Sequence, residues 1–327
     1  MVTIKDIATM ANVSRSTVSR VLNNSGYVSE EARKRVEKVI EETGYVPSGY
    51  AKSLRTKQTK VIGVILPTIQ TETPSRVVTG LGRELSKHGY QILLANTDHD
   101  KEKELEYLDL LVRQVDGIVL IATNTEPELT QKIKSMNLPF VMVGQEAENV
   151  ICVTYDDYHV ARDVTAFLVD KGHTQIGFIG VDETDQAVGC FRKKGFYDEM
   201  KSHDLPIEEA WVQKGVFDID SGCKAMKKII EDSKQRPTAI FAVTDRLAIG
   251  AMSYVKRIGM EIPKDIAIAG IGASELSQYV DPPLTTVDYK NETAGEEAAK
   301  QLLAFIQGED YQKKFVLDYR LLSRDSV

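Results

Sequence analysis

The chain has 327 residues, of which 42% are hydrophobic and 27% charged, as in a globular protein with two or three domains. It has no run of 18 or more apolar residues, and its first residues lack the pattern of a secretory signal, so we expect neither a membrane span nor export. The net charge of −7 is unevenly distributed, because residues 1–60 carry 11 basic and 6 acidic side chains and the remainder carries 30 and 42. A basic head on an acidic body is typical of proteins whose head binds a polyanion.

Two short helices are predicted at the start of the chain. Thr3 precedes an apolar helical pattern and Asp6 follows three residues later, an arrangement that caps a helix, which should end near Asn12. Ser14 is the expected cap of a second helix, whose apolar face carries Val18, Val21 and Leu22.

A third helix is predicted from the Ser29 cap to Gly44. The first two helices are joined by about three residues, and the second has a polar, basic outer face. This arrangement predicts an all-α helix-turn-helix head, which places its second helix in the major groove of DNA. On the pattern alone, a small helical subdomain with a solvated basic face is the alternative.

From residue 61 the chain alternates between short apolar runs and helical patterns. The predicted strands are 61–66, 90–95, 117–121, 140–143, 175–179, 239–243 and 266–271. The predicted helices are 77–88, 101–113, 126–136, 157–171, 188–202, 220–232 and 245–258. Such alternation predicts an α/β body of two doubly wound parallel-sheet subdomains, with a ligand cleft beyond the carboxyl ends of the strands.

No motif in the sequence indicates catalysis. The patterns GxGxxG, GxxxxGK[ST] and GxSxG are absent, and the five histidines lack the spacing of metal ligands, so we expect no catalytic residue, metal or cofactor. The three cysteines are far apart in the sequence, which favours reduced thiols in a cytoplasmic protein: Cys152, Cys190 and Cys223.

Two runs in the head, TIKDIA at 3–8 and VSRSTVSRVLN at 13–23, have a distinctive order and spacing, and YVP follows at 45–47. They closely resemble the head of the lactose/galactose-repressor (LacI/GalR) family. The resemblance extends more loosely over about residues 2–325, and its landmarks in the body are 114–118, 172–173, 192–196, 244–245 and 283–287. It implies a body like the periplasmic sugar-binding proteins.

The resemblance implies which residues of the head contact DNA. The expected base contacts are Arg15, Ser16 and Arg20. Arginine suits this role because its planar guanidinium binds O6 and N7 of guanine together. The expected contacts with phosphates, or with the neighbouring helix, are Ser14, Thr17, Ser19 and Asn23.

The polar, basic segment 48–60 is the expected hinge between head and body. The resemblance implies that it becomes a helix only on the operator, where Leu54 wedges into the minor groove, Ala51 lets two hinge helices approach and Arg55 follows the phosphates. Gly49 departs from the family pattern and costs about 1 kcal/mol of helix stability relative to alanine. Away from DNA, a flexible solvated linker is the alternative.

We therefore expect three regions: a head at 1–47, a hinge at 48–60 and an effector-binding and dimerisation domain at 61–327. Within the last, one subdomain should combine 61–155 with 287–313, and the other 156–284 with 315–327.

The resemblance also implies an effector pocket, with Arg192 as a clamp for hydroxyl or carboxylate groups and Phe217 and Tyr155 as aromatic walls. The expected lining is Ser75, Arg76, Gln145, Tyr155, Arg192, Phe217, Thr244, Asp245, Ser274 and Tyr289. Ser274 and Gln145 stand where the family commonly has acidic residues, and Arg76 makes the predicted rim more basic.

Together these features predict a homodimeric repressor of a sugar-utilisation operon, released from a palindromic operator by a small sugar or sugar phosphate. Likeness to sucrose- and trehalose-type repressors favours a disaccharide, and Arg76 with Arg192 leaves a phosphorylated form open. Control by a protein partner or corepressor is the main alternative, and a sugar-handling enzyme with an accessory DNA-binding head is a third.

Overall fold

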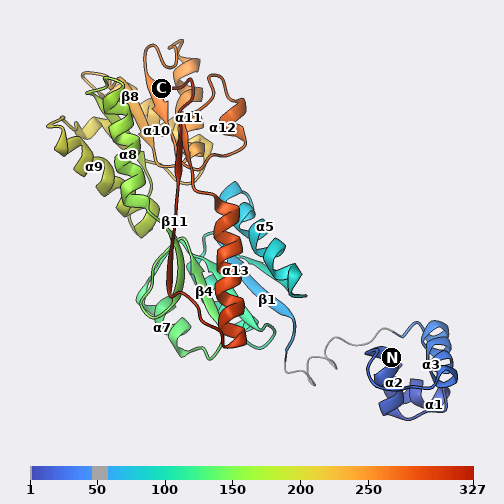
Figure 1. Cartoon of the computed structure of the whole chain (residues 1–327). Coiled ribbons are helices and arrows are strands. Elements are labelled where there is room, and N and C mark those ends of the chain that lie inside the picture. Colours follow the sequence, from blue (N-terminus) through green and yellow to red (C-terminus); the bar gives the residue numbers. More distant parts are fainter. Residues whose placement is uncertain (1, 46–57) are drawn as a thin grey trace. The chain divides into compact units, whose positions relative to one another are not determined.

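The computed structural model describes residues 2–45 and 58–327, and the chain divides into two units, one up to residue 59 and one from residue 60 to 327. They are the helical head and the α/β body in Figure 1. The predicted hinge positions Ala51, Leu54 and Arg55 lie outside the described residues.

The head consists of three helices, α1 (Ile4–Met10), α2 (Arg15–Leu22) and α3 (Glu30–Thr43), which confirms the predicted elements. Thr3 and Asp6 form a reciprocal cap at the start of α1, because Thr3 N–H donates to the Asp6 carboxylate at 2.9 Å and Asp6 N–H donates to the Thr3 hydroxyl at 3.3 Å. The helices pack around fully buried apolar side chains, which include Ile7, Val18 and Val36.

The first subdomain of the body contains a six-stranded parallel sheet in the order β11-β5-β4-β3-β1-β2. Its strands are β1 (Val61–Leu66), β2 (Gln91–Asn96), β3 (Gly117–Ile121), β4 (Phe140–Val143), β5 (Ile151–Tyr155) and β11 (Lys314–Leu317). Alternate residues of the central strands belong to two apolar cores, one on each face. One core includes α5 (Glu72–Lys87) and α13 (Asn291–Gln307), and the other α6 (Lys101–Leu111) and α7 (Pro127–Ser135).

The second subdomain contains a four-stranded parallel sheet in the order β7-β6-β8-β9. Its strands are β6 (Ile176–Gly180), β7 (Val212–Lys214), β8 (Ala239–Ala242) and β9 (Ala267–Ala269). Two further strands, β10 (Thr286–Asp288) and β12 (Arg320–Leu322), pair antiparallel. Its helices are α8 (Asp157–Asp170), η1 (Gln186–Phe191), α9 (Arg192–Ser202), η2 (Glu209–Trp211), α10 (Ile219–Asp232), α11 (Asp245–Arg257) and α12 (Leu276–Tyr279).

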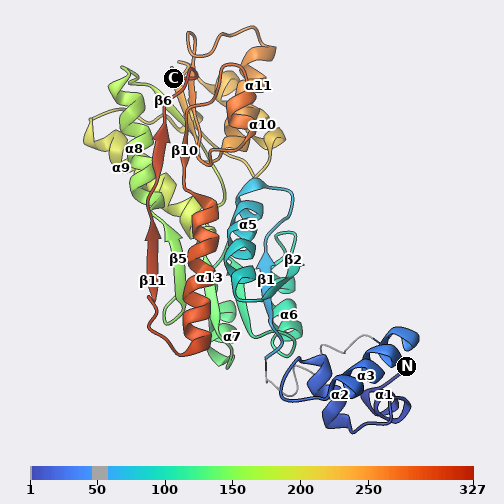
Figure 2. The same ribbon diagram turned by 45° about the vertical axis from the view of Figure 1, so that its right-hand side comes forward.

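The chain passes between the two subdomains after β5, after β10 and after β11 (Figure 2). The expected boundary at the last crossing was wrong, because residues 315–317 were assigned to the second subdomain and lie in β11, in the first sheet. There Phe315 pairs with Val153 of β5. Conversely, residues 287–288 lie in β10, within the second subdomain. Neither β5 nor β11 was predicted, so no strand was expected beside residues 314–317.

Helix α5 begins at Glu72, five residues before its predicted start. Pro74 is compatible with this earlier start, because it lies in the first helical turn, where backbone N–H groups have no partner inside the helix. The predicted helix 188–202 covers α9 and residues 188–191 of the π-helix η1, but the π-helical backbone was not predicted. Its backbone makes a wide turn, in which Cys190 N–H donates to the Asp185 carbonyl at 3.1 Å, and it leads directly into Arg192.

Helices α5 and α13 pack closely enough to require glycine on both sides. A Cβ atom built on Gly80 would lie 1.9 Å from the Glu292 carbonyl oxygen, and one on Gly295 would lie 1.9 Å from the Val77 carbonyl oxygen. Both helices begin at the cleft between the subdomains, so this contact fixes the positions of two parts of its wall.

Candidate functional site

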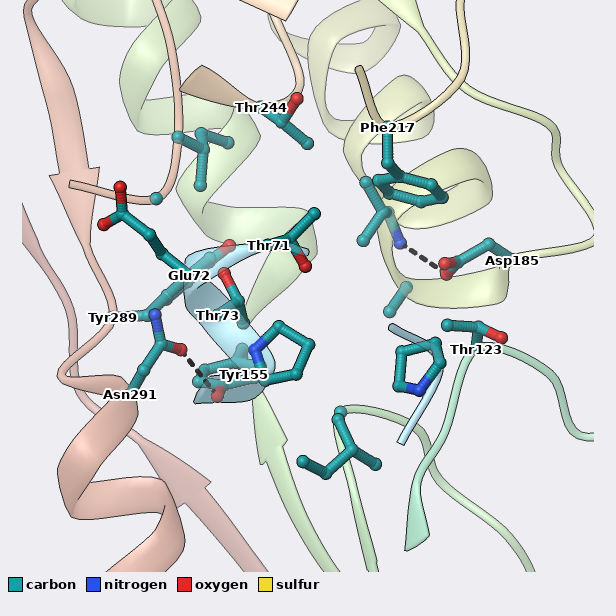
Figure 3. A pocket seen from close by; sticks show the side chains of 18 of the residues that line it. Thr71, Glu72, Thr73, Thr123, Tyr155, Asp185, Phe217, Thr244, Tyr289 and Asn291 are labelled. Atoms are coloured by element: carbon teal, nitrogen blue, oxygen red, sulfur yellow. Dashed lines mark hydrogen bonds between the residues drawn. The ribbon is translucent and has the colours of Figure 1, made fainter. Parts of the chain in front are cut away.

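A cavity of about 180 Å³ lies between the subdomains, beyond the carboxyl ends of the strands. Its polar lining comes from both sides, as Figure 3 shows for Thr71 and Thr123 of the first subdomain and Asp185 and Thr244 of the second. The parallel topology explains why both subdomains contribute. In each sheet the strands end at one edge, and the segments that follow β1 and β3 in the first sheet, and β6 and β8 in the second, begin there and reach the cavity.

Eight of the ten expected pocket residues line this cavity: Gln145, Tyr155, Arg192, Phe217, Thr244, Asp245, Ser274 and Tyr289. Ser75 and Arg76 are not among the lining residues. The Ser75 hydroxyl is exposed and donates to the Glu72 carbonyl at 2.9 Å. Arg76 pairs with the Glu72 carboxylate at 3.0 Å and donates to the Ala273 carbonyl at 2.8 Å.

Arg192 is buried, and each of its three guanidinium nitrogens contacts a group of the protein itself. Its Nε and Nη2 each lie 2.7 Å from Oδ1 of Asp157, and its Nη1 donates to the Val243 carbonyl. The guanidinium also lies 5.2 Å from the centre of the Tyr289 ring, whose hydroxyl donates to Asp157 at 2.9 Å. Arg192 therefore forms part of the pocket wall and holds no free positive charge there.

Tyr155 and Tyr289 form one aromatic wall, with ring centres 4.6 Å apart. The Tyr155 hydroxyl donates to the side chain of Asn291 at 2.7 Å, as drawn in Figure 3. Burial raises the pKa of both phenols, so both remain protonated donors at neutral pH. Phe217 supplies a second wall and stacks against His99 with ring centres 5.9 Å apart.

Three further contacts join the subdomains across the cleft. The Gln145 amide donates to the Asp185 carboxylate at 2.7 Å, and burial raises the pKa of that carboxyl group. At the other side, Glu72 accepts from the Glu275 backbone N–H at 2.8 Å, and Arg76 donates to Ala273 as described above. With the stacking of His99 on Phe217, these contacts hold the cleft in a closed arrangement.

Asp245 organises the loop that follows β9. Its carboxylate accepts from the Thr286 hydroxyl and from the Ser274 backbone N–H, the latter at 2.6 Å. Burial raises the pKa of this carboxyl group, and those hydrogen bonds oppose the change. Asp245 is 2% exposed, so its main contacts are with the protein itself.

In the head, the expected base-contacting side chains Arg15, Ser16 and Arg20 are all exposed on α2. Ser14 caps the helix by accepting from Thr17 N–H at 3.1 Å.

The other expected phosphate contacts are partly engaged within the head. The Ser14 hydroxyl lies 2.8 Å from the Thr17 hydroxyl, and Asn23 donates to the Ser19 backbone carbonyl at 2.5 Å. Of the predicted apolar face of α2, Val18 is fully buried, Val21 is 8% exposed and Leu22 is half-buried.

Several lining residues were missed by the sequence analysis: Glu72, His99, Asp157, Asp185, Arg246 and Asn291. Asp157 had a detectable signal, because it is the second acidic residue after the aromatic position 155. Asp185 and Asn291 had none, because each adjoins a turn or crossing that was not predicted. Within residues 2–45 and 58–327, no helix is long and apolar enough to cross a membrane, and no group of side chains is arranged to hold a metal ion.

Comparison with known families covers both units of the chain. Residues 3–48 match the bacterial regulatory proteins of the lacI family, and residues 165–327 match a periplasmic binding protein-like domain. The repressor PurR of Vibrio vulnificus is 32% identical over 100% of this chain and 99% of its own length. CytR of Escherichia coli K12 is 32% identical (99% and 96%), and catabolite control protein A of Priestia megaterium is 33% identical (100% and 99%).

Solved structures also match essentially the whole chain. The transcriptional regulator CelR in complex with cellobiose has a TM-score of 0.76 and 28% sequence identity, and the match covers 100% of both chains. The lac repressor dimer bound to operator and the anti-inducer ONPF has a TM-score of 0.88 and 24% identity, with 99% of this chain and 98% of that one covered, and shows the common fold.

The helix-turn-helix head and the periplasmic-binding-protein-like body define a DNA-binding transcriptional repressor with a ligand-binding domain, and not an enzyme. The sequence identity and coverage of its relatives also show its family. The chain belongs to the lacI family of bacterial transcriptional regulators.

Proposed function

We propose that the protein represses a sugar-utilisation operon as a homodimer on a palindromic operator, and that a small sugar, with a disaccharide preferred, releases it. The observation that carries the effector class is the mixed lining of the closed cavity. Aromatic walls at Tyr155, Tyr289 and Phe217 can cover the apolar face of a sugar ring, while Thr71, Thr244 and similar side chains can bind its hydroxyl groups. The CelR relative, whose structure contains cellobiose, supports the same class.

The charges around the cavity favour an unphosphorylated sugar over a sugar phosphate. Arg192 is neutralised by Asp157, and Arg76 is paired with Glu72 outside the lining. Beyond these two pairs, the cavity lining carries the acidic side chains Asp185 and Asp245 and one further guanidinium, Arg246. A phosphate group would therefore meet two acidic side chains against one guanidinium.

For the DNA complex, we propose that Arg15, Ser16 and Arg20 read bases and that Ser14, Thr17, Ser19 and Asn23 lie against the backbone. The exposed face of α2 and its short connection to α1 support this assignment. The minor-groove roles of Ala51, Leu54 and Arg55 remain predictions from the sequence. Two identical heads would read the two halves of a palindromic operator, which is why a homodimer is expected.

The experiment that tests the effector class is a thermal shift of the full chain against matched panels of neutral sugars, sugar acids and sugar phosphates. Because a ligand that binds only the folded state raises its apparent stability, we expect one neutral sugar to raise Tm in a concentration-dependent manner. A duplex selected by the protein from a randomised pool then reports the direction of regulation. An inducer lowers affinity for that duplex.

A sugar that raises the affinity for the duplex would make the protein a corepressor-dependent regulator. Stabilisation by a sugar phosphate alone would contradict the unphosphorylated effector. If no compound in the three panels raises Tm, the sugar effector is wrong and control by a protein partner takes its place, and the selected duplex would then serve to assay that partner.

A further inference from the structure

Lys60, the first residue of the body, has a left-handed backbone conformation with a φ of +58°. Among the described residues, nine that are not glycine have a positive φ, and six of these are asparagine, aspartate or histidine, the types that tolerate it. Lysine has no such tolerance, because its Cβ crowds the backbone in this conformation. Such a conformation persists only where the surroundings hold it, and it occurs mostly at functional sites.

Three contacts within the body hold Lys60. Its backbone N–H donates to the Asp116 carboxylate at 2.9 Å, and its carbonyl accepts from the Gln91 N–H at 2.9 Å. Its ammonium group lies 4.2 Å from the centre of the Tyr90 ring, which is 6% exposed. Asp116 also donates its own N–H to the Val61 carbonyl at 2.8 Å. The peptide groups on both sides of Lys60 are therefore fixed.

The partners of Lys60 belong to the rigid frame of the first subdomain. Asp116 directly precedes β3 and Gln91 begins β2, and both strands pair with β1, which starts one residue after Lys60. Tyr90 is part of the apolar core on one face of this sheet. β1 and β3 end at the effector cavity, whose wall includes the segments that follow them. Lys60 is thus fixed to the sheet that carries the first subdomain's part of the cavity.

The positive charge of Lys60 has a simpler explanation, which is contact with a DNA phosphate. Such a contact needs the ammonium group alone and gives no reason for a left-handed backbone. The structure instead holds the backbone with two hydrogen bonds and places the ammonium group over Tyr90. The contacts of Lys60 therefore favour a role in which the direction of the chain matters more than the charge.

We propose that Lys60 is a positioning residue for operator binding: held by Asp116 and Tyr90, it fixes the direction in which the chain leaves the body. One residue of the connection between body and head is then ordered before DNA is bound, so binding does not have to order it. The proposal rests on the DNA-binding head of the family and is independent of the class of effector.

Three neutral substitutions separate the backbone of Lys60 from its charge. Lys60→Asn keeps the tolerance of a left-handed conformation, Lys60→Gly frees the backbone, and Lys60→Val disfavours a positive φ, while all three remove the same charge. Fluorescence anisotropy of the full chain on the duplex selected by the wild type measures operator affinity. We expect a loss below about threefold in Lys60→Asn, of about tenfold in Lys60→Gly, and a larger loss in Lys60→Val.

The salt dependence of binding provides an independent measurement. Loss of a phosphate contact reduces the slope of log affinity against log salt by about one for each lysine, whereas loss of a positioning contact leaves the slope unchanged. We therefore expect the wild-type slope in all three variants. Equal losses of affinity in the three variants, with a reduced slope, would show that Lys60 contacts phosphate and would overturn the proposal.

Asp116 allows a test in which the two explanations predict opposite signs. Asp116→Ala removes an acidic group, so electrostatics alone would strengthen DNA binding. Because it also removes the acceptor for the Lys60 N–H, we expect operator affinity to fall by about three- to tenfold, and Asp116→Asn, which keeps an acceptor oxygen, to recover most of this loss. Stronger binding by Asp116→Ala would contradict the positioning role.

Asn149→Val is the matched control for backbone strain, because Asn149 is an exposed residue of the same subdomain with a φ of +62°. It should lower Tm and leave operator affinity unchanged. Lys60→Val should lower both. If Lys60→Val lowers Tm as Asn149→Val does and leaves operator affinity at the wild-type value, Lys60 serves only the stability of the body and the proposal is wrong.

Discussion

The burial of Arg192 determines how its function can be tested. The side chain is 7% exposed and shares the Asp157 carboxylate with Tyr289. Breaking a buried ion pair by removing one partner leaves an uncompensated charge, which costs about 3–5 kcal/mol. A loss of effector response in Arg192→Ala therefore has two causes, a missing ligand contact and a weakened second subdomain.

We predict that Arg192→Ala lowers the free energy of unfolding by about 3–5 kcal/mol, and that Arg192→Ala combined with Asp157→Asn recovers part of this loss. Denaturant unfolding of the two variants and of Asp157→Asn alone completes the double-mutant cycle. Arg162→Ala is the control, because its partner Glu199 is also buried but its own side chain is 38% exposed. If Arg192→Ala cost no more than Arg162→Ala, the buried pair would have no structural role.

Glu104 is a buried carboxyl group that the effector site does not use. It is 3% exposed on α6 and accepts from the Asn124 amide at 2.6 Å. Burial raises its pKa to about 6, and the hydrogen bond from Asn124 only partly opposes this. The folded protein therefore binds more protons than the unfolded chain between pH 4.5 and about 6, so stability falls as pH rises through that window.

Glu104→Gln keeps an acceptor for Asn124 and removes the charge. We predict that its Tm exceeds that of the wild type above pH 6, because its free energy of unfolding is higher by at most about 2 kcal/mol. The difference should disappear below pH 4.5. Scanning calorimetry at several pH values measures this, with Glu102→Gln, at an exposed site on the same helix, as the control. A constant difference between pH 4 and pH 8 would contradict the assignment.

At this scale the sequence predicted caps and buried faces well, because both depend on residues three or four apart. Ser14, Ser29 and Gly44 all cap helices as expected. The sequence predicted which residues line the cavity better than it predicted the contacts that those residues make. Arg192 lies in the wall but is occupied by Asp157, and this pairing joins positions 35 residues apart that no local pattern relates.

Among the elements, most strands and helices with a clear apolar period were predicted. β5 and β11 were missed although β5 is as long as the predicted β3, because the two strands pair with each other across more than 150 residues of sequence and no local pattern relates them. The crossings between subdomains depend on these elements, so their boundaries were predicted least accurately.

The glycine contact of α5 and α13 allows a prediction for a pair of elements. We expect Gly295→Ala to lower the free energy of unfolding by about 1–3 kcal/mol, because its methyl group would have to displace the Val77 carbonyl. Gly82→Ala on α5 is the matched control, since its Cβ would meet only Ile92 at 3.7 Å, and it should be neutral or stabilising by up to about 1 kcal/mol. Urea unfolding of both variants measures the difference. Equal midpoints would mean that the helices separate without cost.

For the whole molecule, the contacts across the cleft hold the two subdomains in one arrangement. Arg76 contributes to closure from outside the cavity, through its bond to the Ala273 carbonyl. When the binding-competent form is only partly populated, the apparent affinity falls by the same fraction. Residues that hold the cleft closed can therefore change effector affinity without touching the effector.

We predict that Arg76→Ala increases the radius of gyration in small-angle scattering and weakens binding of the stabilising sugar by about two- to tenfold. Arg83→Ala is the control on the same helix, because Arg83 pairs with Glu292 and Glu296 inside the first subdomain. It should leave both quantities unchanged. An unchanged scattering profile for Arg76→Ala would show that this contact does not hold the cleft.

The place of β11 also has a consequence for how the protein is made. The six-stranded sheet needs residues 314–317 at its edge, beside β5, although its other strands end at residue 155. The head needs nothing beyond its own three helices for its core. During synthesis the head can therefore fold before the body is made, whereas the six-stranded sheet of the body stays incomplete until residues 314–317 leave the ribosome. A nascent chain would carry a finished DNA reader long before it had the ligand sensor that controls it.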